Sequence, residues 1–283
     1  MADVSWPTFS VVIPTYRRRQ QLCQCLEGLA PYFNPSGKRP PVGTIEVIVS
    51  DDAKDEELRL LLQQRYPWCC YTQGPSRGPA ANRNHGARQA RNDWLAFTDD
   101  DCLTQPGWIE SFALTAAHYD VMEGRTSAAG TRIRVDEECP INETGGYLWS
   151  CNFAIRRKCF FQLGGFNEHF PAAAMEDVEL NRRINKAGLR RQFVASAEVR
   201  HPWRQRKGRH FLRAKAGSIA TYVALHPEVA KAFATPVMLL NLLRSLRADL
   251  STAIAIRSLR GLPRQIGLEV YAAGATWRAL RQP

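Results

Sequence analysis

The 283-residue chain lacks several patterns that would assign it to a class at once. No apolar run approaches the roughly 20 residues needed to span a bilayer. Residues 1–7 contain no basic stretch followed by an apolar one, so no secretory signal is expected. No Gly-x-Gly-x-x-Gly follows the first apolar run, which argues against a dinucleotide oxidoreductase. The eight cysteines include no Cys-x-x-Cys pair, so we expect reduced thiols in a cytoplasmic protein.

Acidic side chains are scarce at the C-terminal end. Residues 1–199 carry 23 Lys/Arg against 24 Asp/Glu, whereas residues 200–283 carry 15 against 3. The net charge of +11 is therefore C-terminal, which predicts a polyanionic partner for that end. We place a domain boundary near residue 205, between a domain of residues 1–204 and a basic region of residues 205–283.

Two helices are predicted in the basic region, at about residues 236–259 and 262–280. Leu242, Leu246, Leu250 and Ile254 would share one face, and arginines would fall elsewhere around the helix. Such a helix fits peripheral docking on an anionic membrane, at the inner face of the cell membrane. A helical cap or a homodimer interface, with its arginines facing water, is the alternative.

Short apolar runs alternate with helical patterns in the first part of the chain, starting at Phe9, Thr44 and Trp94. This order predicts an α/β fold with a mostly parallel sheet flanked by helices. Three of the strands end in polar residues: Pro14-Thr15-Tyr16, Asp51-Asp52 and Asp99-Asp100-Asp101. Because ligands bind outside the carboxyl ends of such strands, we expect a ligand cleft there.

The carboxylates of Asp99, Asp100 and Asp101 repel one another if they lie together without a counter-ion. A divalent cation, Mn²⁺ or Mg²⁺, shared with substrate phosphates would stabilise them. A solvated acidic turn or a helix N-cap is the alternative, since aspartate is favoured in both.

Six pieces of the sequence, in order, are similar to a known family. They are Val11 to Tyr16, Val49 to Asp52, Gly78 to Gly86, Asp99 to Asp101, Gly164 to Glu168 and Met175 to Leu180. The chain resembles the inverting family 2 glycosyltransferases, which use nucleotide-sugars and have the GT-A fold, Rossmann-like with helices on both faces of the sheet. The resemblance covers about residues 9–201 and implies a nucleotide-sugar half at about 9–105 and an acceptor half at about 106–204.

The resemblance implies a role for each matching residue on the donor side. Pro14, Thr15 and Tyr16 would form the lip that contacts the base, and Asp51 or Asp52 would accept a hydrogen bond from uracil. Arg83 would face ribose and pyrophosphate. Asp101 would bind the cation, Asp99 would contact ribose or the cation, and Asp100 could do either. His201 is a candidate further metal ligand, with a satisfied, partly buried histidine as the alternative.

The acceptor side follows from the same resemblance. Asp177 would be the general base, within the pair Glu176-Asp177 at a helix start, where the helix dipole alone also favours carboxylates. Trp149 and Asn152 would line the acceptor site, although core packing is an equally good reason for a tryptophan.

We therefore expect a metal-dependent inverting glycosyltransferase of the hexosyltransferase type, using a UDP-sugar and a saccharide or lipid-linked acceptor in polysaccharide or glycolipid assembly. The Gln-x-x-Arg-Trp motif of processive synthases is missing, which favours one sugar per event. The alternatives are a sugar-nucleotide nucleotidyltransferase and a non-enzymatic nucleic-acid-binding protein. No nucleic-acid partner is expected, because such a binder would leave the acidic clusters unexplained.

Overall fold

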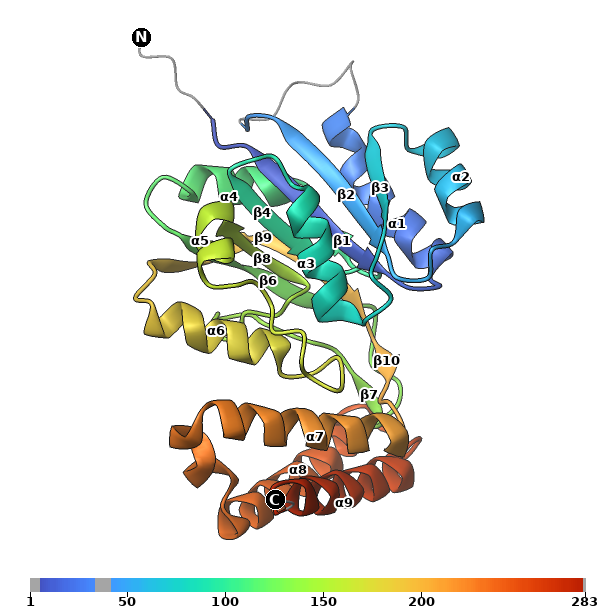
Figure 1. Cartoon of the computed structure of the whole chain (residues 1–283). Helices are drawn as coiled ribbons and strands as arrows, with labels where there is room; N and C mark the ends of the chain where they lie inside the picture. Colours follow the sequence, from blue (N-terminus) through green and yellow to red (C-terminus); the bar gives the residue numbers. More distant parts are fainter. Residues whose placement is uncertain (1–5, 34–41, 282–283) are drawn as a thin grey trace. The chain divides into compact units, whose positions relative to one another are not determined.

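The computed structural model describes residues 6–33 and 42–281, and its contacts divide them into two compact units (Figure 1). The first unit holds the chain up to Ala128 together with Pro140–Glu168 and Glu176–Pro202. The second holds Ala129–Cys139, His169–Met175 and the chain from Trp203 onward. The two short segments that join the second unit from earlier in the chain were not predicted from the sequence.

An eight-stranded sheet forms the centre of the first unit, in the order β3-β2-β1-β4-β8-β6-β9-β5. The pairs β1–β2, β1–β4 and β2–β3 are parallel, and the pairs β4–β8, β6–β8 and β5–β9 are antiparallel. The bounds are β1 Phe9–Thr15, β2 Ile45–Asp51, β3 Cys69–Gln73, β4 Trp94–Thr98, β5 Leu103–Thr104, β6 Val121–Ala129, β8 Asn152–Arg156 and β9 Arg191–Pro202.

Helices cover both faces of this sheet (Figure 1). Val11 and Ile13 of β1 belong to a core shared with α1, α2 and α4, whereas Val12 between them packs with α3, α5 and α6. Alternate residues of a strand point to opposite faces, so a continuous apolar run is what a doubly covered strand requires. The bounds are α1 Arg19–Leu29, η1 Ala30–Phe33, α2 Glu56–Arg65, α3 Pro79–Gln89, α4 Trp108–Thr115, α5 Arg157–Gln162 and α6 Glu176–Lys186.

The second unit is mainly helical. Helix α9 packs against both α7 and α8, and the short strands β7 and β10 pair antiparallel. Asp136 is fully buried and accepts hydrogen bonds from Arg134 and Arg264, each at 2.8 Å. The bounds are β7 Glu137–Glu138, β10 Arg204–Gln205, α7 Arg209–Leu225, η2 Pro227–Phe233, α8 Thr235–Ala255 and α9 Leu262–Ala279.

The predicted fold class, α/β with a C-terminal helical extension, is confirmed, and three local expectations were wrong. The sequence pattern favours two short strands, at Phe193 to Ala195 and Glu198 to His201, and a single strand, β9, is present instead. Helix α7 was not predicted, because its basic first turns hide the buried positions Leu212, Ala216 and Tyr222. On α8 the expected shared face is divided, since Leu242 and Leu246 are partly buried but Leu250 and Ile254 are exposed.

Among the described residues, no single helix is long and apolar enough to cross a membrane. The pair η2 and α8, bent by 54°, meets the length and composition criteria only when taken together. All eight cysteines lie within the described residues, and none of them forms a disulfide there.

Candidate active site

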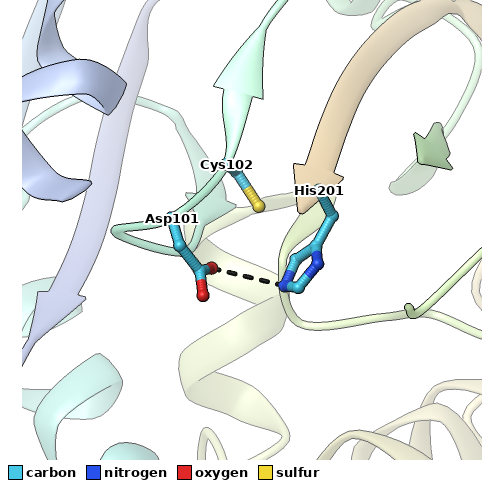
Figure 2. Close-up of side chains that lie close together, drawn as sticks. All are labelled: Asp101, Cys102 and His201. Carbon is cyan, nitrogen blue, oxygen red and sulfur yellow. Dashed lines mark ion pairs between the residues drawn. The ribbon is translucent and has the colours of Figure 1, made fainter. Parts of the chain in front are cut away.

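Strand pairing brings His201 to Asp101. β5 follows the aspartate triplet directly and pairs antiparallel with the end of β9, with Leu103 opposite Arg200. Antiparallel pairing therefore places Cys102, one residue before β5, opposite His201, and Asp101 precedes Cys102 in the chain. Figure 2 shows the result: His201 Nε2 lies 3.3 Å from Asp101 Oδ1. The imidazole is fully buried, and its Nδ1 lies 2.8 Å from the Pro202 carbonyl oxygen.

Cys102 is a third potential ligand that the sequence analysis did not predict. One donor atom from each of Asp101, Cys102 and His201 lies within 4.8 Å of the others (Figure 2). A hydrogen bond with Cys151 and burial raise the pKa of the Cys102 thiol well above its usual value. The carboxylate and the imidazole are therefore the ready ligands, and together they fit a divalent cation.

Arg18 contacts two members of the aspartate triplet. Its Nη1 lies 3.0 Å from Asp100 Oδ1 and 3.0 Å from Asp101 Oδ2. Asp100 also accepts a hydrogen bond from Thr15 Oγ1 at 2.8 Å, so the end of β1 is tied to the triplet after β4. Burial raises the pKa of Asp100 to about 6, although Arg18 opposes the shift. Arg18 was not assigned from sequence, and its only signal is the basic run directly after β1.

Arg83 connects the aspartate triplet after β4 with the start of α6. It lies in α3, is 5% exposed, and donates to Asp99 Oδ1 at 2.6 Å. Its Nη1 lies 3.4 Å from Glu176 Oε1. Burial works against the charge of the guanidinium, but Asp99 and Glu176 outweigh it and raise the Arg83 pKa. One cation thus bridges carboxylates that are far apart in sequence.

Glu176 and Asp177 begin α6, directly after Met175, whose φ of 79° turns the chain sharply. Burial, followed by the charge of Asp177, raises the pKa of Glu176 to about 7. Desolvation also raises the pKa of Asp177, and backbone N–H groups of Val178 and Ser150 oppose that shift. A carboxylate with a raised pKa is a stronger base than an exposed one, which suits proton abstraction.

The carboxylates of Asp51 and Asp52 are largely occupied by the protein itself. Asp51 is fully buried and accepts from Ala53 N, Asp55 N and Tyr71 Oη. Asp52 accepts from Ser76 N and Gly78 N, both at 2.9 Å, which fixes the turn before α3. Pro14 is buried at the end of β1, next to the exposed Tyr16.

The two predicted acceptor residues have different surroundings. Trp149 is partly exposed and stacks on Tyr147, with ring centroids 5.5 Å apart and an interplanar angle of 7°. Asn152 is 1% exposed: its Oδ1 accepts from Trp108 Nε1, and its Nδ2 donates to the carbonyls of Arg125 and Ala197. Both Nδ2 hydrogens of Asn152 are thus used within the fold, and the acceptor-binding role of this residue stays a prediction.

The residues that directly follow Tyr16 in the sequence line a hollow of about 650 Å³. It is lined by Arg17, Arg18, Arg19, Gln20, Gln21, Ala53 and Asp55. Three arginines make this wall strongly cationic, although Arg19 is already paired with Asp55 and Glu57.

The predicted residues thus form two linked sets. Asp99, Arg83 and Glu176 are in direct contact, and Asp100 and Asp101 share Arg18. The residues that sequence reasoning missed are Arg18, Cys102, Tyr147 and Ser150.

Two solved structures are similar in fold to this chain. The structure resembles the mannosyltransferase PcManGT from Pyrobaculum calidifontis, solved with GDP-Man and Mn²⁺, with a TM-score of 0.62 at 17% identity, covering 98% of this chain and 88% of that one. It also resembles S. aureus TarS 1-349 in complex with UDP-GlcNAc, with a TM-score of 0.56 at 17% identity over 96% of this chain and 90% of that one. At such identities the likeness shows the fold, which is GT-A.

The family follows from the sequence. The family model described as glycosyl transferase family 2 matches residues 10–164, and the chain belongs to this family. The pre-mycofactocin glycosyltransferase of Mycobacterium tuberculosis is 31% identical over 174 residues, which cover 54% of this chain and 36% of that protein. The chain thus spans about a third of that relative's length. The resemblance inferred from the six motifs is confirmed, and it favours a transferase over the nucleotidyltransferase and nucleic-acid-binding alternatives.

Proposed function

We propose that the protein is a metal-dependent inverting glycosyltransferase that transfers one hexose from a UDP-sugar to a hydroxyl of a saccharide or lipid-linked acceptor, in glycan assembly at the cytoplasmic face of a membrane. The observation that carries the proposal is the double contact of Arg83 with Asp99 and Glu176. It joins the carboxylates proposed to hold the donor to the helix start that carries the proposed base.

Asp177 is the proposed general base. It takes the proton of the acceptor hydroxyl as that oxygen forms a bond to the anomeric carbon of the donor sugar. The bond from this carbon to the diphosphate oxygen breaks, and its electron pair leaves with the nucleoside diphosphate. One displacement, with attack opposite to the leaving group, inverts the configuration. The Ser150 and Val178 N–H groups orient the Asp177 carboxylate for this step.

Asp101 and His201 are the proposed metal ligands, with Asp99 beside them toward ribose. A bound cation would act as a Lewis acid on the diphosphate and neutralise charge on the leaving group. Mg²⁺ strongly prefers oxygen ligands, so the imidazole favours Mn²⁺. Arg18 and Arg83 are the proposed diphosphate-binding cations, because guanidinium groups pair well with phosphate oxygens. PcManGT and TarS, whose structures contain nucleotide-sugars, support this type of donor.

Hydrogen-bond capacity at Asp51 favours uracil as the base. Both acceptor positions of Oδ2 are used, by Asp55 N and Tyr71 Oη, whereas Oδ1 accepts only from Ala53 N. One acceptor position remains, and the uracil imide offers one N–H whereas guanine offers N–H groups at two adjacent positions. Because Asp51 is fully buried, this contact requires a movement that exposes Oδ1 while its hydrogen bond from Ala53 N is kept. Thr15 and the exposed Tyr16 form the proposed outer edge of the base site.

The stacked pair Tyr147 and Trp149 is the proposed acceptor platform. Flat aromatic faces pack well against sugar rings, and Tyr147 is 52% exposed. The pair belongs to the same loop as Ser150, which contacts Asp177. An acceptor sugar on this platform would therefore lie on the side of the proposed base.

The donor proposal is tested by thermal shift with nucleoside diphosphates and nucleotide-sugars, each with and without Mn²⁺. Ligands that bind only the folded state raise its stability according to their concentration relative to Kd. We expect stabilisation by uridine compounds that grows when Mn²⁺ is added. Equal stabilisation by every base, or none by any, would contradict the donor assignment.

The catalytic roles are tested with two variants and one control. Asp177→Asn should lower kcat by about 10²- to 10⁴-fold while keeping the nucleotide-induced thermal shift. Asp101→Asn should lose the part of that shift that depends on Mn²⁺. Asp93→Asn, at the opposite end of β4, is the matched control and should retain both. Full transfer activity in Asp177→Asn would remove the assignment of the base.

A further inference from the structure

One side of α8 is apolar and faces solvent. Leu239, Leu240, Leu243, Leu250 and Ile254 are all exposed, with Leu243 at 58% and Ile254 at 77%. Their spacing places them within an arc of about 100° on the exposed side of the helix, beside the packed side that carries the buried Asp249 and Ala253. We call these five residues, together with Arg244 and Arg247, the outer face of α8. A helix that is apolar on its exposed side as well as on its packed side indicates a further contact.

The charge on this helix has one sign at its surface. Arg244 and Arg247 are exposed within the outer face, and Arg257 and Arg260 are exposed just after the helix ends. The one acidic residue of α8, Asp249, is buried and accepts a hydrogen bond from Gln265 Nε2 at 3.1 Å. The outer face therefore combines leucines with arginines and carries no carboxylate that could neutralise them.

This charge pattern discriminates between the two partners that could cover the leucines. A second copy packed on the same face would bring Arg247, which lies within the stripe, close to its own symmetry mate without an acidic partner. An anionic lipid surface accepts both features, since leucines enter the acyl boundary while arginine stems extend their charged ends to phosphates.

We propose that the outer face of α8 docks on an anionic membrane surface, with the helix axis parallel to the bilayer. The docking proposal specifies the membrane partner of the proposed glycosyltransferase. It rests on the proposed function only for the biological purpose of docking. Vesicle binding is measured without any sugar donor, so a failure of docking and a failure of glycosyl transfer are distinguishable.

The test is co-sedimentation of the full chain with vesicles of phosphatidylcholine alone and with about one third phosphatidylglycerol. We expect binding to the anionic vesicles that high salt reverses. The variant Arg244→Ser/Arg247→Ser should bind about 25-fold more weakly, since each cation near the surface contributes about fivefold. The variant Leu243→Ser/Leu250→Ser/Ile254→Ser should bind more than about tenfold more weakly.

The matched control is Leu60→Ser/Leu114→Ser, which removes two exposed leucines from α2 and α4 and should bind like the unaltered chain. Circular dichroism melting checks that each variant is folded. Uridine nucleotide binding should be unchanged in the α8 variants, because these residues lie outside the proposed active site.

Three results would overturn the proposal. One is absent binding, or equal binding to neutral and anionic vesicles. Another is a dimer in sedimentation equilibrium that the leucine variant dissociates, which would make a second copy the partner. The third is retention on membranes through high salt and alkaline washing, which would show that the bent pair η2 and α8 inserts rather than lies on the surface.

Discussion

At the scale of single residues, Glu176 is a carboxyl group whose charge its surroundings oppose. It is 5% exposed, and its Oε2 has no hydrogen-bond partner within the described residues. Burial and the charge of Asp177 outweigh the nearby Arg83 and raise its pKa from 4.5 to about 7. Because Glu176 and Asp177 interact strongly, the two carboxyl groups titrate as a pair, and each pKa describes the pair more than a single residue.

This raised pKa predicts a pH-dependent stability. Between pH 4.5 and about 7 the folded protein binds more protons at Glu176 than the unfolded chain does. The contribution of this group to the free energy of unfolding therefore falls as the pH rises through that window. Glu176→Gln should be more stable than the unaltered protein at pH values above 7, and the difference should vanish as the pH approaches 4.5.

The measurement is the free energy of unfolding in urea across this pH range, without nucleotide or metal. Glu143→Gln, which neutralises an exposed carboxylate, is the control and should show no such trend. A Glu176→Gln variant that is less stable at high pH would mean that the Arg83 contact outweighs burial.

A role for a single residue could be predicted where a charged residue stands at a fixed place in a recognisable motif. The roles of Asp101, Arg83 and Asp177 come from motif order and stay predictions, and the structure places Arg83 in contact with Asp99 and Glu176. The hydrogen bonds of Asn152 could not be predicted, because its partners Trp108, Arg125 and Ala197 come from three distant segments. Only the folded structure brings these segments to one amide group.

At the scale of elements, the loop of residues 142–150 is fixed by one buried carboxylate on β6. Glu123 Oε2 accepts from Gly146 N at 2.8 Å and from Leu148 N at 3.0 Å, and its Oε1 is paired with Arg191. Leu148 has a φ of 47°, in the left-handed region that residues other than glycine seldom adopt without supporting contacts. The same loop carries the Ser150 N–H that contacts Asp177.

Glu123→Gln should therefore affect both stability and catalysis. Loss of one partner of a buried ion pair costs about 3 kcal/mol, measurable by urea unfolding. Because Ser150 would lose its position at Asp177, kcat should fall, whereas KM for the donor should change little. Glu143→Gln, in the same loop but exposed, is the control. An unchanged kcat in folded Glu123→Gln would show that the loop does not position the base.

Regular elements were predictable when their burial gave a simple pattern. β1, β2 and β4 are apolar along most of their length because helices cover both of their faces. β9 escaped detection as one strand because exposed Ala195 and Ser196 interrupt its buried positions. A single exposed stretch in an otherwise buried strand looks like a turn in the sequence alone.

At the scale of the whole molecule, the excess positive charge and the proposed active-site residues lie in different parts of the chain. The proposed donor and base residues belong to the first unit, whereas the exposed leucines of α8 belong to the second. The sequence predicted the basic C-terminal region from its composition. It could not predict that residues 129–139 and 169–175 join the second unit, because that depends on contacts distant in sequence.

Hydrogen exchange should report this separation. Adding a uridine nucleotide with Mn²⁺ should slow amide exchange at the ends of β1 and β4, at the start of α6 and at the end of β9. Exchange in α8 should stay unchanged, because its residues take no part in the proposed donor site. The measurement is mass spectrometry of peptides after timed labelling. Protection confined to α8 would contradict the assigned donor site.

The pairing of β5 with β9 has a consequence for how the protein is made. Asp101 leaves the ribosome long before His201, and the two meet only after the final strand of the sheet has been added. With Asp101 and His201 as the proposed ligands, a partly synthesised chain would lack the imidazole, and we expect metal loading only after β9 has joined the sheet.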